Sequence, residues 1–237
     1  MYTGVTAGAG ILCWLFVPER RESLSRGESL WKHIGGVVRL EKVWWQALIV
    51  VCAYVGYKGV DDYSLYAVQV YDMDEVEGAR VSTLSAWVRP FAAIGAGWLA
   101  DRVSASLVSA LCFAAMLGSY AWLAMETPPP SMLWFLYLNV LVTCAAIFGL
   151  RGVYFALFQE AAVPIAATGT AVGLVSVIGY TPDIFVNLVA GWLLDRTPGV
   201  EGHQHFFAFL MASSALGLLA ALAFRRSPPP SSTAGAP

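Results

Sequence analysis

Long apolar runs separated by short polar segments extend along the sequence. The runs cover residues 1–17, 43–70, 81–100, 103–125, 132–158, 165–194 and 206–224. Most of them exceed the length of about 18 residues that marks a candidate for a helix crossing the hydrocarbon core of a bilayer. A helix satisfies its own backbone hydrogen bonds, and the runs lack the alternation of apolar and polar residues found in transmembrane strands. The pattern therefore predicts an all-α, polytopic membrane protein with seven spanning helices.

The composition favours a membrane protein over the soluble classes. Of the 237 residues, 58% are hydrophobic and 13% are charged, whereas an ordinary soluble domain carries about 25% charged residues. The net charge of -2, with no basic stripe, argues against a nucleic-acid partner. The expected partners are the lipid bilayer and a small-molecule solute.

The polar segments suggest where the parts of the chain begin and end. We expect a first spanning helix at 1–17, a charged cytoplasmic loop at 18–42, a six-helix unit at 43–226, and a disordered cytoplasmic tail at 227–237. The second half of the loop mixes aromatic and aliphatic residues with Lys32 and Arg39. That mixture is typical of an amphipathic segment at the membrane interface.

Lysine and arginine residues gather on one side of the predicted bundle. With the loop at 18–42 placed in the cytoplasm, ten basic residues fall inside and two fall outside. The inside residues are Arg20, Arg21, Arg26, Lys32, Arg39, Lys42, Arg102, Arg151, Arg225 and Arg226, and the outside residues are Arg80 and Arg196. Because cytoplasmic loops are rich in Lys and Arg, the amino terminus of this chain is expected outside and the carboxyl terminus in the cytoplasm. A first helix without a polar lead-in also suggests a helix from the middle of a longer protein.

A six-residue motif occurs twice. The sequence Gly-Trp-Leu-Ala-Asp-Arg at 97–102 recurs as Gly-Trp-Leu-Leu-Asp-Arg at 191–196. The first copy ends the third predicted helix on the cytoplasmic side, and the second copy ends the sixth on the outer side. The chain is therefore expected to contain two three-helix units of opposite topology, which is an architecture of membrane transporters.

The first copy of the motif resembles a signature of the major facilitator superfamily. Gly97-x-Leu99-x-Asp101-Arg102 is similar to the loop signature between the second and third helix of each half, although Ser-Ala-Ser at 104–106 departs from its downstream Gly and basic residues. The resemblance implies half of a twelve-helix fold, namely helix six, the central loop and helices seven to twelve. It also implies a gating motif formed by Gly97, Asp101 and Arg102. The implied partner is the missing amino-terminal half, helices one to five, or a second copy of the chain.

Two short stretches resemble a narrower group within that superfamily. Residues 151–157, Arg-Gly-Val-Tyr-Phe-Ala-Leu, and residues 179–183, Gly-Tyr-Thr-Pro-Asp, are similar to a bacterial branch described as sugar-phosphate-permease-like. This resemblance implies a secondary active transporter of the inner membrane. Its expected substrate is a small organic or phosphorylated anion, moved by proton symport or by exchange.

Ionisable residues inside the apolar runs are the candidates for a substrate or ion site, because each costs at least about 2.5–3.5 kcal/mol at mid-membrane. Lys58, Asp61 and Asp62 form the densest group. Lys58 and Asp62 are expected to share one helical face, with Asp61 turned away. Two interpretations remain open. Lys58 faces an anion while an aspartate carries a proton, or the group is an internal ion pair near the outer end of a helix broken at Gly59.

Arg89 and Asp183 occupy equivalent positions in the two repeats. Each precedes its Asp-Arg motif by about 18 Å along a helix, which places it near the middle of a hydrocarbon core about 30 Å thick. Each also adjoins a proline, which loosens a helix locally and is tolerated beside a wet cavity. We expect these residues to contact substrate or, alternatively, to form a buried pair that fixes packing.

Three further residues are secondary candidates for the site: Arg151, Tyr54 and Tyr180. Arg151 stands close to the cytoplasmic end of its run, where we expect its side chain to snorkel to the interface or to pair with Glu160. The two tyrosines are candidates for lining a sugar-like site.

We expect no cofactor and no metal site. The four cysteines stand alone in apolar runs, and His203 and His205 have no third ligand nearby, so we expect the histidines to cap the last helix at the membrane surface. The sequence contains no GxxxxGK[ST], HExxH or GxSxG motif, which argues against an ATP-driven motor and against an enzyme. The alternative to a transporter is a truncated, non-transporting fragment or a helper subunit that associates with another membrane protein.

Overall fold

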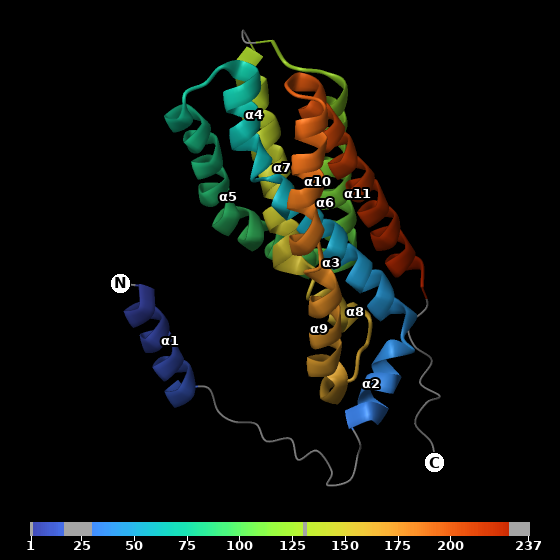
Figure 1. Cartoon of the computed structure of the whole chain (residues 1–237). Helices are drawn as coiled ribbons and strands as arrows, with labels where there is room; N and C mark the ends of the chain where they lie inside the picture. The colour runs from blue at the N-terminus through green and yellow to red at the C-terminus, as the bar shows by residue number, and fades with distance from the viewer. Residues whose placement is uncertain (1, 17–29, 130–131, 228–237) are drawn as a thin grey trace. The chain divides into compact units, whose positions relative to one another are not determined.

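The protein is described by a computed structural model, which covers residues 2–16, 30–129 and 132–227 (Figure 1). Within these residues the chain forms helices joined by short turns, with no strand. The helices are α1 (Tyr2–Phe16), α2 (Leu30–Val38), α3 (Glu41–Gly59), α4 (Asp62–Tyr71), α5 (Glu75–Arg102), α6 (Ala105–Met125), α7 (Leu133–Val153), α8 (Leu157–Glu160), α9 (Ile165–Gly179), α10 (Pro182–Arg196) and α11 (Val200–Arg226). Arg20, Arg21 and Arg26 of the predicted loop, and residues 228–237 of the predicted tail, lie outside the described residues.

The chain divides into two compact units, Met1–Lys32 and His33–Pro237. In the first unit, α1 is an apolar helix whose large side chains, Trp14 and Phe16 among them, are exposed. The second unit contains α3 to α11, and with them every candidate site residue.

Five helical segments of the described chain are long and apolar enough to cross a membrane: Glu41–Tyr71, Ala105–Met125, Leu133–Val153, Ala167–Arg196 and Val200–Arg226. They confirm an all-α polytopic membrane fold and correspond to five of the seven predicted spans. The other two predicted spans do not meet this criterion of length and apolar composition. Thr3–Phe16 is a shorter apolar helix, and α5 has sufficient length at 28 residues but carries many polar and charged side chains.

Two of the five spans are interrupted near their middle. α3 gives way to α4 at Val60 and Asp61, which confirms the predicted break at Gly59. α9 gives way to α10 after Tyr180, and Pro182 stands in the first turn of α10, where a residue without an N–H group leaves no donor unsatisfied. Such breaks are tolerated at membrane depth where the backbone adjoins protein or a cavity.

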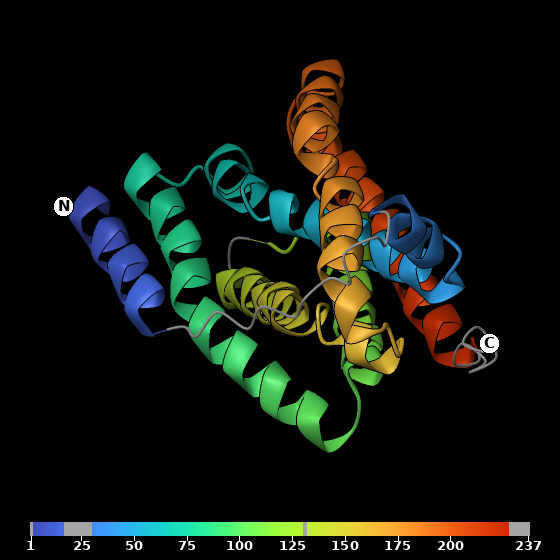
Figure 2. The same ribbon diagram turned by 90° about the horizontal axis from the view of Figure 1, so that it is seen from below.

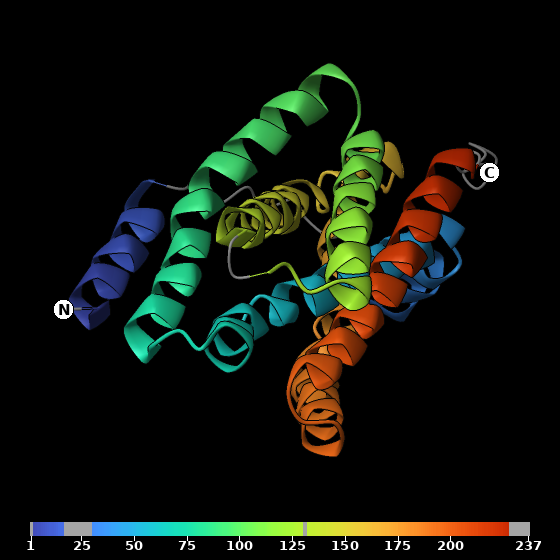
Figure 3. The same ribbon diagram turned by 90° about the horizontal axis from the view of Figure 1, so that it is seen from above.

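The contacts between helices support an inverted repeat. We take α3–α4, α5 and α6 as one unit and α7–α8, α9–α10 and α11 as the other. α5 and α6 of the first unit both pack on α7 of the second. In the equivalent way, α9–α10 and α11 of the second unit pack on α3 of the first. The last helices of the two units, α6 and α11, pack on each other. Figure 2 shows α5 beside α7, and Figure 3 shows α6 beside α11. The helices that carry the two copies of the motif, α5 and α10, run in opposite directions (Figure 1).

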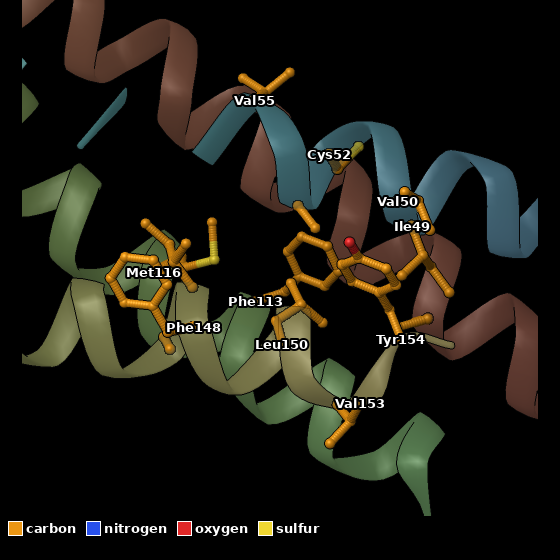
Figure 4. Packing of buried hydrophobic residues seen from close by; sticks show 14 of the residues in the cluster. Ile49, Val50, Cys52, Val55, Phe113, Met116, Phe148, Leu150, Val153 and Tyr154 are labelled. Carbon is orange, nitrogen blue, oxygen red and sulfur yellow. The ribbon is translucent and has the colours of Figure 1, made fainter. Parts of the chain in front are cut away.

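The apolar core lies where α3, α6, α7 and α11 meet. Figure 4 shows Phe113 and Met116 of α6 among buried side chains of α3 and α7, such as Ile49 and Leu150. All four are fully buried. α3 also packs on α9 and α10, so it contacts helices of the second repeat along much of its surface.

Two glycines allow α3 and α6 to approach their neighbours closely. A Cβ atom at Gly179 of α9 would overlap the side chain of Val50 on α3. A Cβ atom at Gly217 of α11 would overlap the ring of Phe113 on α6. Small residues serve this purpose at helix contacts within membranes.

Candidate functional site

Ionisable groups of α3 and α10 meet where their spans are broken. Lys58 Nζ lies 3.4 Å from Asp183 Oδ1 and 3.7 Å from Asp61 Oδ2. The Tyr54 hydroxyl donates a hydrogen bond of 3.0 Å to Asp183 Oδ2. Only 16% of the Lys58 side chain is exposed, against 54% for Asp183. Four of the predicted site residues therefore form one network at the surface of α3.

Tyrosine rings continue the network toward α7. The ring centroid of Tyr54 lies 5.0 Å from that of Tyr180 and 5.5 Å from that of Tyr57. Arg151 of α7 stacks over both α3 tyrosines, with its Cζ 4.1 Å from the Tyr57 ring centroid and 5.4 Å from the Tyr54 centroid. Tyr54 therefore lies between Arg151 and the ring of Tyr180 in this chain of contacts.

A cavity of about 200 Å³ adjoins this cluster. Its lining residues are Tyr57, Arg89, Ala93, Phe148, Arg151 and Gly152, from α3, α5 and α7. Arg89 Cζ lies 4.6 Å from the ring centroid of Phe148. The two arginines of the cavity are therefore each held over an aromatic ring, an arrangement that favours a cation electrostatically.

Arg151 faces the interior of the bundle. Its Nη1 atom is buried and has no hydrogen-bond partner within the described part of the chain. The prediction that Arg151 snorkels is therefore wrong, and so is the predicted pair with Glu160. The carboxylate of Glu160 instead accepts a 3.1 Å hydrogen bond from the backbone N–H of Ser106, and its carbonyl accepts one of 3.3 Å from Lys42.

Two arginines, Arg89 and Arg151, line the cavity. Among the described residues, neither Arg89 nor Arg151 takes part in an ion pair, whereas Lys58 has two carboxylate neighbours. The buried Arg89–Asp183 pair, one of the two alternatives from the sequence, is not observed, since Asp183 binds Lys58. A guanidinium group is always protonated and matches the paired oxygens of a carboxylate or phosphate. The cavity is therefore suited to a small oxyanion.

Asp62 does not join this network. Its side chain is 6% exposed, and Oδ2 lies 3.1 Å from Nδ1 of His203 on α11. Lys58 contacts Asp61 instead of the predicted Asp62, because the break at Val60 and Asp61 interrupts the regular helical register. The predicted surface cap by His203 is also wrong, since His203 is fully buried.

The repeated motif places an arginine over a tryptophan at the end of each helix. Arg102 Cζ lies 3.6 Å from the ring centroid of Trp98, and the second copy shows the same stacking at 5.2 Å. Asp101 is exposed and has no ion-pair partner in the described ranges. The gating role expected for Gly97, Asp101 and Arg102 stays a prediction.

Two residues around these groups were not singled out from the sequence. Phe148 precedes Arg151 by three positions and shares its helical face, a spacing that indicates a possible neighbour of any ligand at Arg151. Gln69 lies with Oε1 2.9 Å from Nε2 of His203. No pattern in the sequence marks it, because an uncharged polar residue near the end of a run draws less notice than the charged residues earlier in the same run.

The fold defines a polytopic helical membrane protein. The sequence profile described as Major Facilitator Superfamily matches residues 1–181. The chain belongs to this superfamily.

Two Escherichia coli (strain K12) proteins are similar to the chain over nearly all of its length. It is 26% identical over 236 residues to inner membrane protein YqcE, covering 94% of the chain and 54% of the relative. It is 24% identical over 220 residues to inner membrane protein YihN, covering 88% of the chain and 52% of the relative. The chain therefore spans about half the length of these relatives. No solved structure matches the chain significantly.

Proposed function

We propose that the chain is the carboxyl-terminal half of a secondary transporter that moves a small organic or phosphorylated anion across the inner membrane by proton symport or by exchange. The observation that carries the proposal is the pair of arginines in one cavity. Arg89 and Arg151 approach that cavity from different helices, each over an aromatic ring and each without an ion-pair partner in the described chain. An anion supplies the acceptor that the buried Nη1 of Arg151 lacks.

A phosphorylated anion fits this site better than a neutral sugar. A phosphate group has several oxygens that two guanidinium groups can bind in bidentate geometry. The neighbouring rings of Tyr54, Tyr57 and Tyr180 offer apolar faces and hydroxyl groups to the rest of the substrate. The similarity of residues 151–157 and 179–183 to the sugar-phosphate-permease-like branch points to the same substrate class.

A second six-helix half would complete the site. The outward faces of α5 and α10, on either side of the candidate site, expose large apolar side chains, namely Trp87, Phe91, Ile94, Trp98, Ile184, Leu188 and Trp192. Contiguous apolar surface of this size indicates contact with protein or lipid. We propose that the second half, an amino-terminal half or a second copy of the chain, packs on these faces and encloses the cavity.

The proposed orientation places the amino terminus of the chain outside and the carboxyl terminus in the cytoplasm. Its support is the bias of ten basic residues against two in the sequence. The printed names of both relatives, which call them inner membrane proteins, favour the inner membrane. α5 is proposed to cross the bilayer as well, with Arg89 facing the cavity and not lipid.

Binding of radiolabelled anions to membranes that contain the full chain tests the proposal. Inorganic phosphate and a hexose phosphate are expected to bind, whereas a neutral hexose and an organic cation are not. Arg151→Gln and Arg89→Gln each lower phosphate affinity by about tenfold or more, because each removes a charged hydrogen bond worth about 1.5–3 kcal/mol. Arg151→Lys retains the charge but loses the bidentate geometry, so its affinity is intermediate.

The matched control is Arg80→Gln, which removes an exposed arginine from the same helix as Arg89. It leaves phosphate affinity unchanged. Binding of the neutral hexose or the cation with no binding of phosphate would overturn the proposal. A chain that binds none of these solutes, and that crosslinks to another membrane protein in detergent extracts, would identify a helper subunit instead.

A further inference from the structure

A second buried polar cluster lies at the start of α4 and of α11, apart from the arginine cavity. Asp62 Oδ2 and His203 Nδ1 are 3.1 Å apart, and His203 Nε2 lies 2.9 Å from Gln69 Oε1. The exposed fractions of the two side chains are 6% for Asp62 and 0% for His203. The edge of Tyr66 packs against the imidazole with ring centroids 5.2 Å apart. Both nitrogens of a fully buried imidazole therefore have a polar partner.

The groups that face this cluster are neutral, so the net charge of the cluster depends only on whether it holds a proton. The titratable neighbours that interact with Asp62 are the phenols of Tyr63 and Tyr66 on α4 and of Tyr120 on α6. Phenols are neutral over the physiological pH range. Within the described residues, His203 is the only ion-pair partner of Asp62.

In the part of the chain that the structure describes, the other charged groups near the cluster are exposed or already paired. On α5, which packs against α4, Glu75, Glu77 and Arg80 are exposed. On α11, His205 is exposed and its Nδ1 lies 3.3 Å from the hydroxyl of Thr197. On α3, Lys58 is engaged with Asp61 and Asp183.

Gln69 allows the cluster to hold His203 in either protonation state. With Oε1 toward His203, both ring nitrogens face oxygen acceptors, which is the arrangement of an imidazolium beside a carboxylate. With the amide turned by half a revolution, its NH2 group donates to Nε2 of a neutral imidazole that still donates from Nδ1 to Asp62. A purely structural pair needs only one of these arrangements.

The cluster and the Lys58 network, which adjoins the anion cavity, meet at one junction between helices. Asp61 and Asp62 are adjacent residues at the junction of α3 and α4, yet Asp61 contacts Lys58 and Asp62 contacts His203. The position of α4 relative to α3 therefore affects the geometry of the cluster and of this network at once. His203 lies in the first turn of α11, close to the end of the bundle where α10 and α11 join (Figure 1).

We propose that Asp62, His203 and Gln69 form the binding site for the coupling proton, separate from the anion cavity. This inference rests on the proposed function. One proton from water binds the neutral imidazole of His203 and gives an imidazolium beside the Asp62 carboxylate, with Gln69 turning its oxygen toward Nε2. The protonated cluster favours the conformation that binds the anion. Release of the proton to water reverses the step.

The experiment measures phosphate affinity against pH for the full chain in lipid nanodiscs, for wild type, Asp62→Asn and His203→Gln. The ionisation of phosphate itself is common to all three proteins and cancels in the comparison. As the pH falls through the titration of His203, wild-type affinity rises relative to that of His203→Gln by up to about tenfold per pH unit, the limit for one linked proton. Asp62→Asn loses the same pH-dependent rise.

Nitrogen NMR of the imidazole groups in the same samples reports the proton directly, because the chain has only three histidines. The His203 signal titrates, and saturating phosphate moves its midpoint to higher pH. The controls are His205→Gln and Asp72→Asn, which remove an exposed histidine and an exposed acid near the same end of the bundle. Both controls keep the wild-type pH dependence.

The possible failures are distinguishable. If phosphate binds but its pH dependence is the same in wild type and His203→Gln, or if the His203 midpoint does not move, the cluster is structural and the inference is overturned while the proposed function stands. If phosphate does not bind wild type at any pH, the proposed function fails and this inference fails with it. Loss of folded protein in His203→Gln is detected by its NMR spectrum, and the phosphate-induced shift in wild type then decides the question.

Discussion

Lys58 of α3 and Asp183 of α10 lie with Nζ and Oδ1 3.4 Å apart, although the two residues belong to opposite repeats of the fold. Lys58 stands in the last turn of α3 and Asp183 in the first turn of α10, each beside the interruption of its span. The contact joins the two repeats at the edge of the arginine cavity. It also neutralises Lys58, whereas Arg89 and Arg151 have no ion-pair partner among the described residues.

Neutralising either member of this pair is expected to impair uptake. Lys58→Gln leaves Asp183 without its cation, and Asp183→Asn leaves a mostly buried Lys58 with only Asp61. Each single variant lowers anion uptake by about tenfold or more, because Lys58→Gln leaves a carboxylate without its cation and Asp183→Asn removes one of the two carboxylates that hold Lys58. Uptake into vesicles that contain the complete carrier measures the effect.

The double variant Lys58→Gln/Asp183→Asn separates packing from transport. It is expected to recover the amount of folded protein without recovering uptake, since the neutral pair restores charge balance but cannot respond to substrate. Glu201→Gln, the neutralisation of an exposed acid, serves as the control. Full uptake by the double variant would mean that the pair only fixes packing.

The aromatic support of Arg151 is testable with two substitutions at one position. Tyr57→Phe keeps the ring that lies 4.1 Å from Arg151 Cζ, whereas Tyr57→Leu removes it. A cation–π contact is worth about 0.5–2 kcal/mol, so Tyr57→Leu is expected to lower phosphate affinity by a factor of about 2–30. Equilibrium binding to purified protein measures this. Equal affinity in the two variants would show that the ring contributes nothing beyond packing.

Glu160 is expected to matter for stability and not for anion binding. Its carboxylate accepts the hydrogen bond of the Ser106 backbone N–H at the start of α6, where an acid also interacts favourably with the helix dipole. Glu160→Ala therefore lowers stability by about 0.5–2 kcal/mol, the range for the loss of a helix cap. Thermal unfolding in detergent detects the loss, and Glu126→Ala, which removes an exposed acid, is the control. A large fall in phosphate affinity in Glu160→Ala would revive a link between Glu160 and Arg151.

The contact of α6 with α11 depends on the absence of a side chain at Gly217. Gly217→Val forces a methyl group into the ring of Phe113 and is expected to cost about 1–3 kcal/mol of stability. Gly118→Val on α6 is the matched control, because a Cβ atom there meets open space. A second variant, Gly217→Val/Phe113→Leu, relieves the overlap and recovers part of the loss. Thermal unfolding of the four proteins decides whether this contact limits stability.

Several features of the site could be predicted because charge inside an apolar run is costly. Lys58, Asp61, Arg89 and Asp183 stand out in the sequence for that reason, and three of them form one network while Arg89 lines the adjoining cavity. Arg151 was misassigned because a position near the end of an apolar run is compatible both with snorkelling and with a cavity. Only the packing of α7 against α3 and α5 distinguishes the two.

The partners of Asp62 could not be predicted from spacing. The rule that residues four apart share a face applies within one continuous helix. At Val60 and Asp61 the backbone keeps helical angles but forms tighter hydrogen bonds to the third residue back, such as Asp61 N–H to the Lys58 carbonyl, which brings residues three apart onto one face. His203 was misassigned for a related reason, since its burial depends on how α4 packs on the first turn of α11.

At the break between α3 and α4, the number of residues in the junction matters to the site as much as their side chains do. Asp61 and Asp62 face different clusters while joined by a single peptide unit. One residue added to or removed from this junction would rotate α4 by about 100° relative to α3, so that both carboxylates would lose their partners together. Relatives with the same chemistry should therefore vary freely in length between α6 and α7 and keep a constant count of residues from Lys58 to Asp62.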